Sequence, residues 1–215
     1  MKDFYKKYLN NDLKLERWQL IGVLCLVIVF AGCFGWLYEF IFYFFNSGMK
    51  TFYYRGANFL PWINIYATGA VMIIFLTKKC KKNPILIFLI AAISTGILEY
   101  IAGYLMYELN GGIRCWDYNT EILNFGNIDG FVCLRSVVSF GLSALLLIYA
   151  VVPCFMYLSQ KVSKKAFLIV SISLCSIFLL DEFYNLFIAD LLGLPRARDI
   201  YSKIGYQYMD YYKNK

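Results

Sequence analysis

Residues 18–45 read WQLIGVLCLVIVFAGCFGWLYEFIFYFF, an apolar run in which Glu39 is the one charged residue. A helix crosses a bilayer with about 20 consecutive apolar residues, and this run is longer. Lysines precede it, as in a secretory signal peptide, but the apolar part of a signal peptide has only about 7–15 residues and ends at a small-residue cleavage site. The run therefore predicts a membrane-spanning helix that remains in the mature chain.

Four more apolar runs follow, at residues 59–77, 84–109, 132–158 and 166–192. The chain of 215 residues is 60% hydrophobic and 16% charged, whereas soluble domains are about 25% charged. The five runs and their short connectors use the whole length, so no separate soluble domain is expected. We therefore predict an all-α fold, a polytopic membrane bundle of about five helices that forms one domain, residues 1–215.

The distribution of lysines predicts how the bundle is oriented. Residues 78–82 and 160–165 contain lysines and no acidic residue, and the segment 1–17 is also rich in lysine. Short positively charged segments stay on the cytoplasmic side of a membrane. We therefore expect a multi-pass protein of the cell membrane with a cytoplasmic N-terminus, and with the loops 46–58 and 110–131 outside.

The C-terminal tail, residues 193–215, fits this scheme less simply, because five spans place it outside although it is basic. One explanation is that the last span breaks at Asp181-Glu182 and re-enters the membrane. The other is that the tail lies on the outer surface, since its apolar residues follow a helical stripe that includes Tyr208. The segment 1–17 has a similar stripe, so we expect short surface helices at both termini.

Composition also excludes several kinds of function. The net charge of +7 comes mainly from residues at the ends of the apolar runs, which indicates membrane orientation rather than a nucleic-acid partner. The chain has no phosphate-binding loop, no histidine and no CxxC pair. We therefore predict no metal site, no cofactor and no catalytic residues. Cys115 and Cys133 fall on the outer side, and the sequence leaves open whether they form a disulfide.

Ionisable residues inside the apolar runs are the strongest functional signal. Each charge near the bilayer centre costs about 2.5–3.5 kcal/mol, so such residues are seldom accidental. At about 1.5 Å of rise per residue, they all fall in the outer half of the membrane. These residues are Glu39, Glu99, Arg135, Asp181 and Glu182.

Two interpretations of this charged layer remain open. Glycines and serines recur at helical spacing on the same faces, which would allow the helices to approach closely and bring the acids together. In the first interpretation, Arg135 neutralises one glutamate and orders the bundle. In the second, the charges line a polar cavity, open to the outside, that binds a cationic group. Arg55 and Asp117 lie in the outer loops, either as part of ordinary interface segments or as caps over that cavity.

A series of short motifs resembles a known family. In chain order the motifs are Gly35-Trp36-Leu37-Tyr38-Glu39, Arg55-Gly56, Pro61-Trp62, Ile65-Tyr66, Glu99 with Gly103, Trp116-Asp117-Tyr118, and Asn124, Gly130 and Cys133-Leu134-Arg135. The set covers about residues 30–145 and resembles the putative ABC-transporter type IV permease family. The chain departs from the family pattern near residues 60–67, where it has Leu60-Pro61-Trp62 and Asn64-Ile65-Tyr66-Ala67. The resemblance implies a multi-pass bacterial membrane protein that works with a separate ATPase subunit.

The first functional hypothesis is therefore a permease-type protein that binds a small cationic or amphiphilic solute. The expected binding residues are Glu39, Arg55, Tyr66, Glu99, Trp116, Asp117, Tyr118 and Arg135. The alternatives are a non-catalytic membrane regulator or assembly subunit and, less favoured because histidine is absent, a lipid-modifying enzyme. Expected partners are membrane lipids, an ATPase subunit docked on residues 1–17, and a second copy of the chain that helps to enclose a path.

Overall fold

The computed structural model describes residues 2–109 and 111–207, and helices are the regular elements of that part of the chain. Four of these helices are long and apolar enough to cross a membrane. They are α2 (Arg17–Asn46), α4 (Pro84–Leu109) and two bent helices, Leu134–Lys161 and Lys164–Leu192. The all-α membrane bundle predicted from the sequence is confirmed, and these helices begin and end within a few residues of the predicted spans.

The second predicted span differs from the others. Its helix, α3, covers only Asn64–Thr77, 14 residues, which at about 1.5 Å per residue is shorter than a bilayer core of about 30 Å. Pro61 lacks an N–H and disfavours a helical conformation before it, so the segment 59–63 is not helical. Non-helical backbone is tolerated at membrane depth only when protein groups satisfy it. Here Ile63 N donates to Gly32 O at 3.1 Å.

One bent helix consists of α5 (Leu134–Leu146), a π-helical turn (Leu147–Val151) and α6 (Val152–Lys161). Pro153 lies just beyond the turn and cannot donate to the carbonyl one turn earlier, which bends the helix. The N-terminal surface helix α1 (Lys2–Leu9) uses the carbonyls at this bend. Tyr8 Oη donates to Ile148 O at 2.7 Å and Tyr5 Oη donates to Tyr149 O at 3.1 Å.

The last long helix passes straight through the acidic pair Asp181-Glu182. It consists of α7 (Lys164–Phe183), a second π-helical turn (Tyr184–Ile188) and α8 (Ala189–Leu192), and it ends at Gly193, whose φ is +63°. A left-handed glycine is the usual end of a helix. The re-entrant alternative is therefore wrong, because the two carboxylates have backbone and amide partners that let the helix continue.

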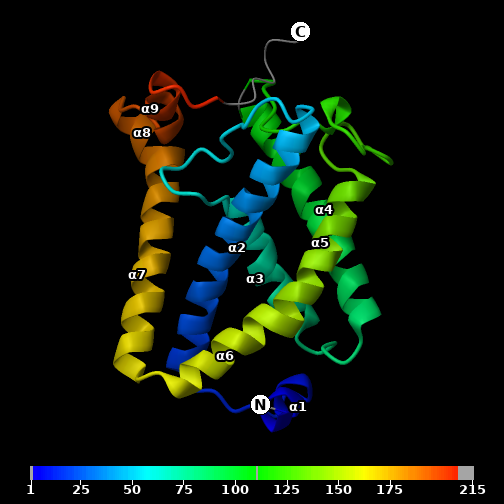
Figure 1. Ribbon diagram of the computed structural model, residues 1–215, viewed down its shortest axis with the longest axis vertical. Coiled ribbons are helices and arrows are strands. Elements are labelled where there is room, and N and C mark those ends of the chain that lie inside the picture. Colours follow the sequence, from blue (N-terminus) through cyan, green and yellow to red (C-terminus); the bar gives the residue numbers. More distant parts are fainter. Residues whose placement is uncertain (1, 110, 208–215) are drawn as a thin grey trace.

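The C-terminal surface helix α9 (Ala197–Lys203) lies at the end of the bundle opposite to the N-terminus (Figure 1). Tyr201 Oη donates to Phe59 O at 2.7 Å, and Tyr54 N donates to Gln207 O at 2.8 Å, so this segment is tied to the loop between α2 and α3. The stripe predicted to include Tyr208 continues into residues 208–215, which lie outside the described residues.

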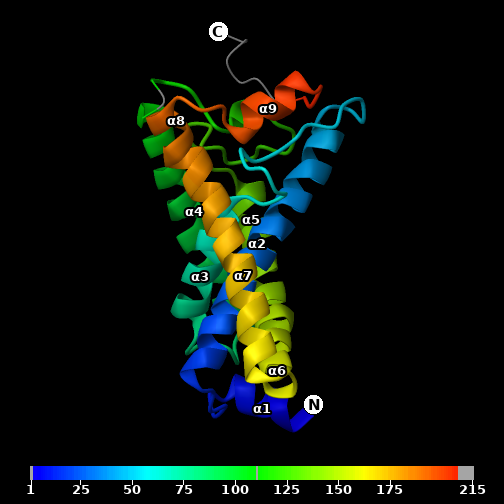
Figure 2. The same cartoon turned by 90° about the vertical axis from the view of Figure 1, so that its left-hand side faces the viewer.

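The bundle has two distinct ends (Figures 1 and 2). The N-terminus, α1 and the two lysine-containing connectors lie at the lower end, and the longer loops lie at the upper end with α8 and α9 (Figure 1). The side view in Figure 2 shows α7 in front of α2. In the interior, α2 packs on α3, α6 and α7, whereas α4 packs on α3 and α5.

Candidate functional site

Three carboxylates and two guanidinium groups meet at the upper end of the bundle. Glu39 of α2 accepts from Arg55 Nε at 2.7 Å and from Tyr66 Oη at 3.1 Å. Tyr66 reaches Glu39 because its ring lies on Gly35, one turn earlier in α2, where a Cβ would overlap the ring. The sequence predicted these small residues as sites of close helix contact, and in the structure Gly35 admits an aromatic ring.

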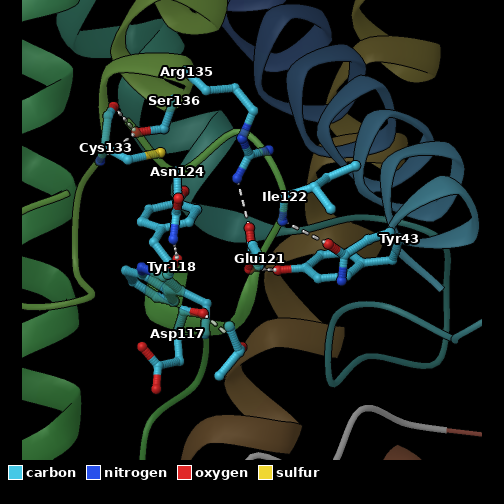
Figure 3. A network of polar contacts seen from close by, with 12 residues as sticks. Tyr43, Asp117, Tyr118, Glu121, Ile122, Asn124, Cys133, Arg135 and Ser136 are labelled. Carbon is cyan, nitrogen blue, oxygen red and sulfur yellow. Dashed lines mark hydrogen bonds and ion pairs between the residues drawn. The ribbon is translucent and has the colours of Figure 1, made fainter. Parts of the chain in front are cut away.

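A second carboxylate, Glu121, comes from the loop between α4 and α5. It accepts from Arg135 Nη2 at 2.5 Å and from Tyr43 Oη; in Figure 3 Arg135 reaches it from above and Tyr43 from the right. The Glu121 side chain is 0% exposed and that of Arg135 is 12% exposed. The Arg135 guanidinium also stacks on Phe42, with Cζ 3.8 Å from the ring centroid.

Part of Arg135 is not satisfied by these contacts. Its Nε is buried and has no hydrogen-bond partner in the described part of the chain. A buried donor without a partner costs about 1–3 kcal/mol, or more when it is charged. This nitrogen is therefore a site at which an acceptor could bind favourably.

The third carboxylate, Glu99 of α4, has a different environment. It accepts from Tyr118 Oη and from Ser136 Oγ, the latter at 2.7 Å, and is only 5% exposed. Among residues 2–109 and 111–207, no lysine or arginine forms an ion pair with it. Glu99 is thus a buried acid held by two hydroxyl groups rather than by a positive charge.

The loop of residues 111–133 folds back into the bundle and delivers Tyr118 and Glu121. Asp117 caps the short helix Tyr118–Thr120 by accepting from Asn119 N at 3.0 Å, and Trp116 Nε1 donates to Phe131 O at 2.9 Å. Gly130 has φ +75°, and a Cβ there would overlap Asp117 and Arg114. The loop is therefore built by its own contacts rather than by helical periodicity.

Burial shifts the pKa values of two loop residues of this network, Glu121 and Tyr118. Burial raises the pKa of the Glu121 carboxyl above its ordinary value, although the hydrogen bond from Tyr43 and the positive charges of Arg135 and Arg55 lower it. Burial also raises the pKa of the Tyr118 hydroxyl, and the neighbouring Glu99 carboxylate adds to this effect. Tyr118 therefore stays a hydrogen-bond donor at neutral pH.

A small polar cavity lies between these groups. Its walls come from α2, α3, α4, α5 and the loop 111–133, and Tyr38, Tyr43 and Phe140 contribute to them. Of the residues predicted from the sequence, six line it: Glu39, Tyr66, Glu99, Trp116, Tyr118 and Arg135. Arg55 is not among the lining residues, but it donates to Glu39, which is. Asp117 points away from the Glu121–Arg135 pair (Figure 3) and has Arg114 as its charged neighbour, at 3.9 Å.

Asp181 and Glu182 form a separate buried acidic pair. Asp181 accepts from Phe59 N and Leu60 N, at 3.0 and 2.9 Å. Glu182 accepts from Asn58 Nδ2 at 2.7 Å and from Asn64 Nδ2 at 3.1 Å. The pair accepts hydrogen bonds from the non-helical segment before α3 and from the first residue of α3, so it anchors this segment. Neither acid is among the lining residues of the cavity.

Three residues of the cavity network had no assigned role in the sequence prediction: Glu121, Tyr43 and Ser136. Glu121 falls within the loop 110–131, which the sequence predicted to lie outside, and nothing in its own neighbourhood places it at the depth of Glu39. The sequence held one indirect indication that this loop returns into the bundle. Gly111 and Gly112 allow the chain to turn back, and both have positive φ in the structure. Cys115 and Cys133, for which a disulfide remained open, are not joined in the structure.

The fold and this network define a polytopic α-helical membrane protein with a charged, aromatic cavity near one end of its bundle. The chain belongs to the family described as putative ABC-transporter type IV, whose family model matches residues 26–186. Neither a curated protein nor a solved structure gives a significant match to it. The family match and the apolar helices identify a transporter-related membrane protein.

Proposed function

We propose that the chain is the membrane subunit of a transport system that binds a small cationic or amphiphilic solute in the polar cavity. The observation that supports this most directly is Glu99, a buried carboxylate without an ion-pair partner in the described part of the chain. The cavity network contains three carboxylates and two arginines, so one negative charge is in excess when all are ionised. A cation of the solute would balance it.

In this proposal the remaining cavity residues position the solute. Tyr66, Trp116 and Tyr118 supply aromatic faces, and aromatic faces attract ammonium groups. Arg55 and Arg135 hold Glu39 and Glu121 in place, at 2.7 and 2.5 Å. Asp117 keeps the loop folded from its outer side, as the cap of the short helix that carries Tyr118.

The proposal also assigns an orientation and partners. The lysine-containing connectors and the N-terminus face the cytoplasm of the cell, following the bias of short loops, so the cavity lies at the level of the outer leaflet. Membrane lipids surround the bundle. Residues 1–17, which include α1, offer the contact for a separate ATPase subunit, because the connectors 78–83 and 162–163 are short. A second copy of the chain would help to enclose a path.

Replacing Glu99 tests this function. Full-length wild type, Glu99→Gln and Glu108→Gln are purified in nanodiscs, and binding of ethylammonium is measured by calorimetry. Glu108 is an exposed acid of the same helix, so its variant controls for the loss of one charge. Glu99→Gln should weaken binding about tenfold or more, which is about 1.4 kcal/mol, and Glu108→Gln should not. No binding to the wild type, or equal binding to all three proteins, would refute the proposal.

The second candidate is a regulator or assembly subunit in which the charges are purely structural. The observation in its favour is that Glu39 and Glu121 already have arginine partners. Binding of a cation that depends on Glu99 separates the two candidates, because a structural role predicts none.

A further inference from the structure

An apolar pocket lies below the polar cavity. Its walls come from α2, α3, α4 and the bent helix that begins with α5, and apolar atoms make up nearly all of its surface. Phe30, Phe34, Ile73, Leu147 and Val151 are among its lining residues. The proposed solute site does not use these residues, so the pocket needs an explanation of its own.

A further pocket lies between this pocket and the polar cavity and shares wall residues with both. This intermediate pocket shares Phe34, Tyr66, Phe140 and Ser143 with the apolar pocket. The same intermediate pocket shares Tyr38, Tyr118 and Arg135 with the polar cavity, besides Tyr66 and Phe140. We call this row of three neighbouring pockets the groove; it has an apolar lower part and a charged upper part.

The groove lies between α2 and α5, and in its middle part Tyr38 Oη of α2 donates to Ser139 Oγ of α5 at 3.3 Å. The helix α2 packs on α3, α6 and α7, whereas α5 packs on α4, so α3 and α4 form the floor between them. Phe30 and Leu146 line the apolar part and are 36% and 44% exposed, so this part reaches the outer face of the bundle. The ring of Phe30 also packs on that of Phe155 of α6, with centroids 6.1 Å apart.

In a membrane the exposed sides of these helices face lipid chains, because a bundle of this kind buries its polar groups inside. A molecule can therefore enter the groove from the bilayer. The upper part offers the Glu99 carboxylate to a positive group, and the lower part offers apolar walls to an alkyl chain. An amphiphile with a positive head group fits both.

We infer that the groove between α2 and α5 binds an amphiphile with an ammonium head group, with its alkyl chain in the apolar pocket. This inference rests on the proposed function for the head group and adds the chain and its site. Lipids with an ammonium group and single-chain alkylammonium compounds share this chemistry.

Gly69 offers a way to fill the apolar part alone. It lines the floor of the pocket, and a Cβ at this position would have its nearest neighbours at 3.9 and 4.0 Å, so a larger side chain starts without a clash. Gly69→Phe should therefore occupy the space of the alkyl chain. Thr68 is exposed on the outside of the same helix, and Thr68→Phe is the matched control.

The experiment compares ethylammonium with dodecylammonium on full-length protein in phosphatidylglycerol nanodiscs, whose lipid has no ammonium group. Empty nanodiscs give the partition of each compound into lipid, and the protein's preference is the ratio beyond this background. The wild type and Thr68→Phe should prefer dodecylammonium about tenfold or more, since the buried chain contributes favourably at each methylene. Gly69→Phe should reduce that ratio to the background value.

The two proposals fail in different ways. If ethylammonium binds in a Glu99-dependent manner but chain length brings no preference, or if Gly69→Phe keeps the preference, the alkyl-chain site is refuted and the head-group site stands. If neither compound binds, both proposals are refuted. Adding phosphatidylethanolamine to the nanodiscs identifies the source: competition with dodecylammonium assigns the groove to a lipid, and unchanged binding assigns it to a single-chain compound.

Discussion

Arg135 and Glu121 form the most deeply buried ion pair of the cavity. Removing one partner of a buried pair leaves an uncompensated charge and typically costs about 3–5 kcal/mol. Arg135→Gln and Glu121→Gln should therefore each lower the amount of folded protein in the membrane, whereas the double variant should recover much of it. The measurement is membrane abundance together with the melting temperature in detergent. Two additive losses would contradict direct coupling of the pair.

The pairing seen in the structure also determines which double variant is informative. Glu39 pairs with Arg55 rather than with Arg135, so Glu39→Gln combined with Arg135→Gln removes members of two different pairs. That combination should show no recovery. It serves as the control for the Arg135–Glu121 variant, because it removes the same number of charges.

Gly35 is the residue that admits the Tyr66 ring to the cavity. Gly35→Ala places a Cβ in that ring and should destabilise the protein by about 1–3 kcal/mol through overpacking. Gly69→Ala is the matched control on the neighbouring helix, since a Cβ there has room and alanine favours a helix by up to about 1 kcal/mol. Melting temperatures in detergent should therefore fall for the first variant and hold or rise for the second. Equal shifts would contradict the packing assigned to Tyr66.

At the scale of elements, the bend between α5 and α6 depends on α1. The π-helical turn and Pro153 leave carbonyls without their usual helical donors, and Tyr8 supplies a hydroxyl to Ile148 O at 2.7 Å. Tyr8 is 1% exposed, so Tyr8→Phe leaves a buried acceptor unsatisfied at a cost of about 1–3 kcal/mol. We expect a lower melting temperature and faster protease cleavage near residues 9–16.

Tyr157 provides the control for this change. Its ring packs edge-on against Phe4 of α1, with centroids 5.3 Å apart, and Tyr157→Phe keeps that ring. The control should leave both the melting temperature and the cleavage rate close to those of the wild type. If Tyr8→Phe behaves in the same way, the hydroxyl contributes nothing to docking of α1.

The elements differ in how well the sequence pattern predicts them. Long apolar runs predict α2 and α4 well, because membrane thickness alone selects their length. Residues 59–63 were assigned to a helix by hydrophobicity, but the N–H groups of Phe59 and Leu60 donate to Asp181, more than 100 positions away. Glu121 was missed for the same reason: its depth is set by long-range contacts of the loop with Tyr43 and Arg135. Neither kind of contact leaves a periodic signal.

At the scale of the whole molecule, one bent helix connects the two ends of the bundle. Its upper part carries Arg135 and Phe140 of the groove, and its bend receives α1. A partner that moves α1 at the lower end would therefore act on the same helix that borders the groove. If the lower end faces the cytoplasm, a cytoplasmic partner that moves α1 would therefore also move the helix that lines the cavity.

Orientation is thus the molecular property on which this arrangement depends. Lys50 and Lys79 are exposed at opposite ends of the bundle, the first after α2 and the second after α3. With a membrane-impermeant maleimide on intact cells, Lys50→Cys should be labelled, and Lys79→Cys only after the membrane is opened. The unsubstituted chain gives the background from native cysteines, and both variants lose one lysine, so they are matched. The reverse pattern would place the cavity at the inner leaflet, where α1 would face outward and could not contact a cytoplasmic ATPase.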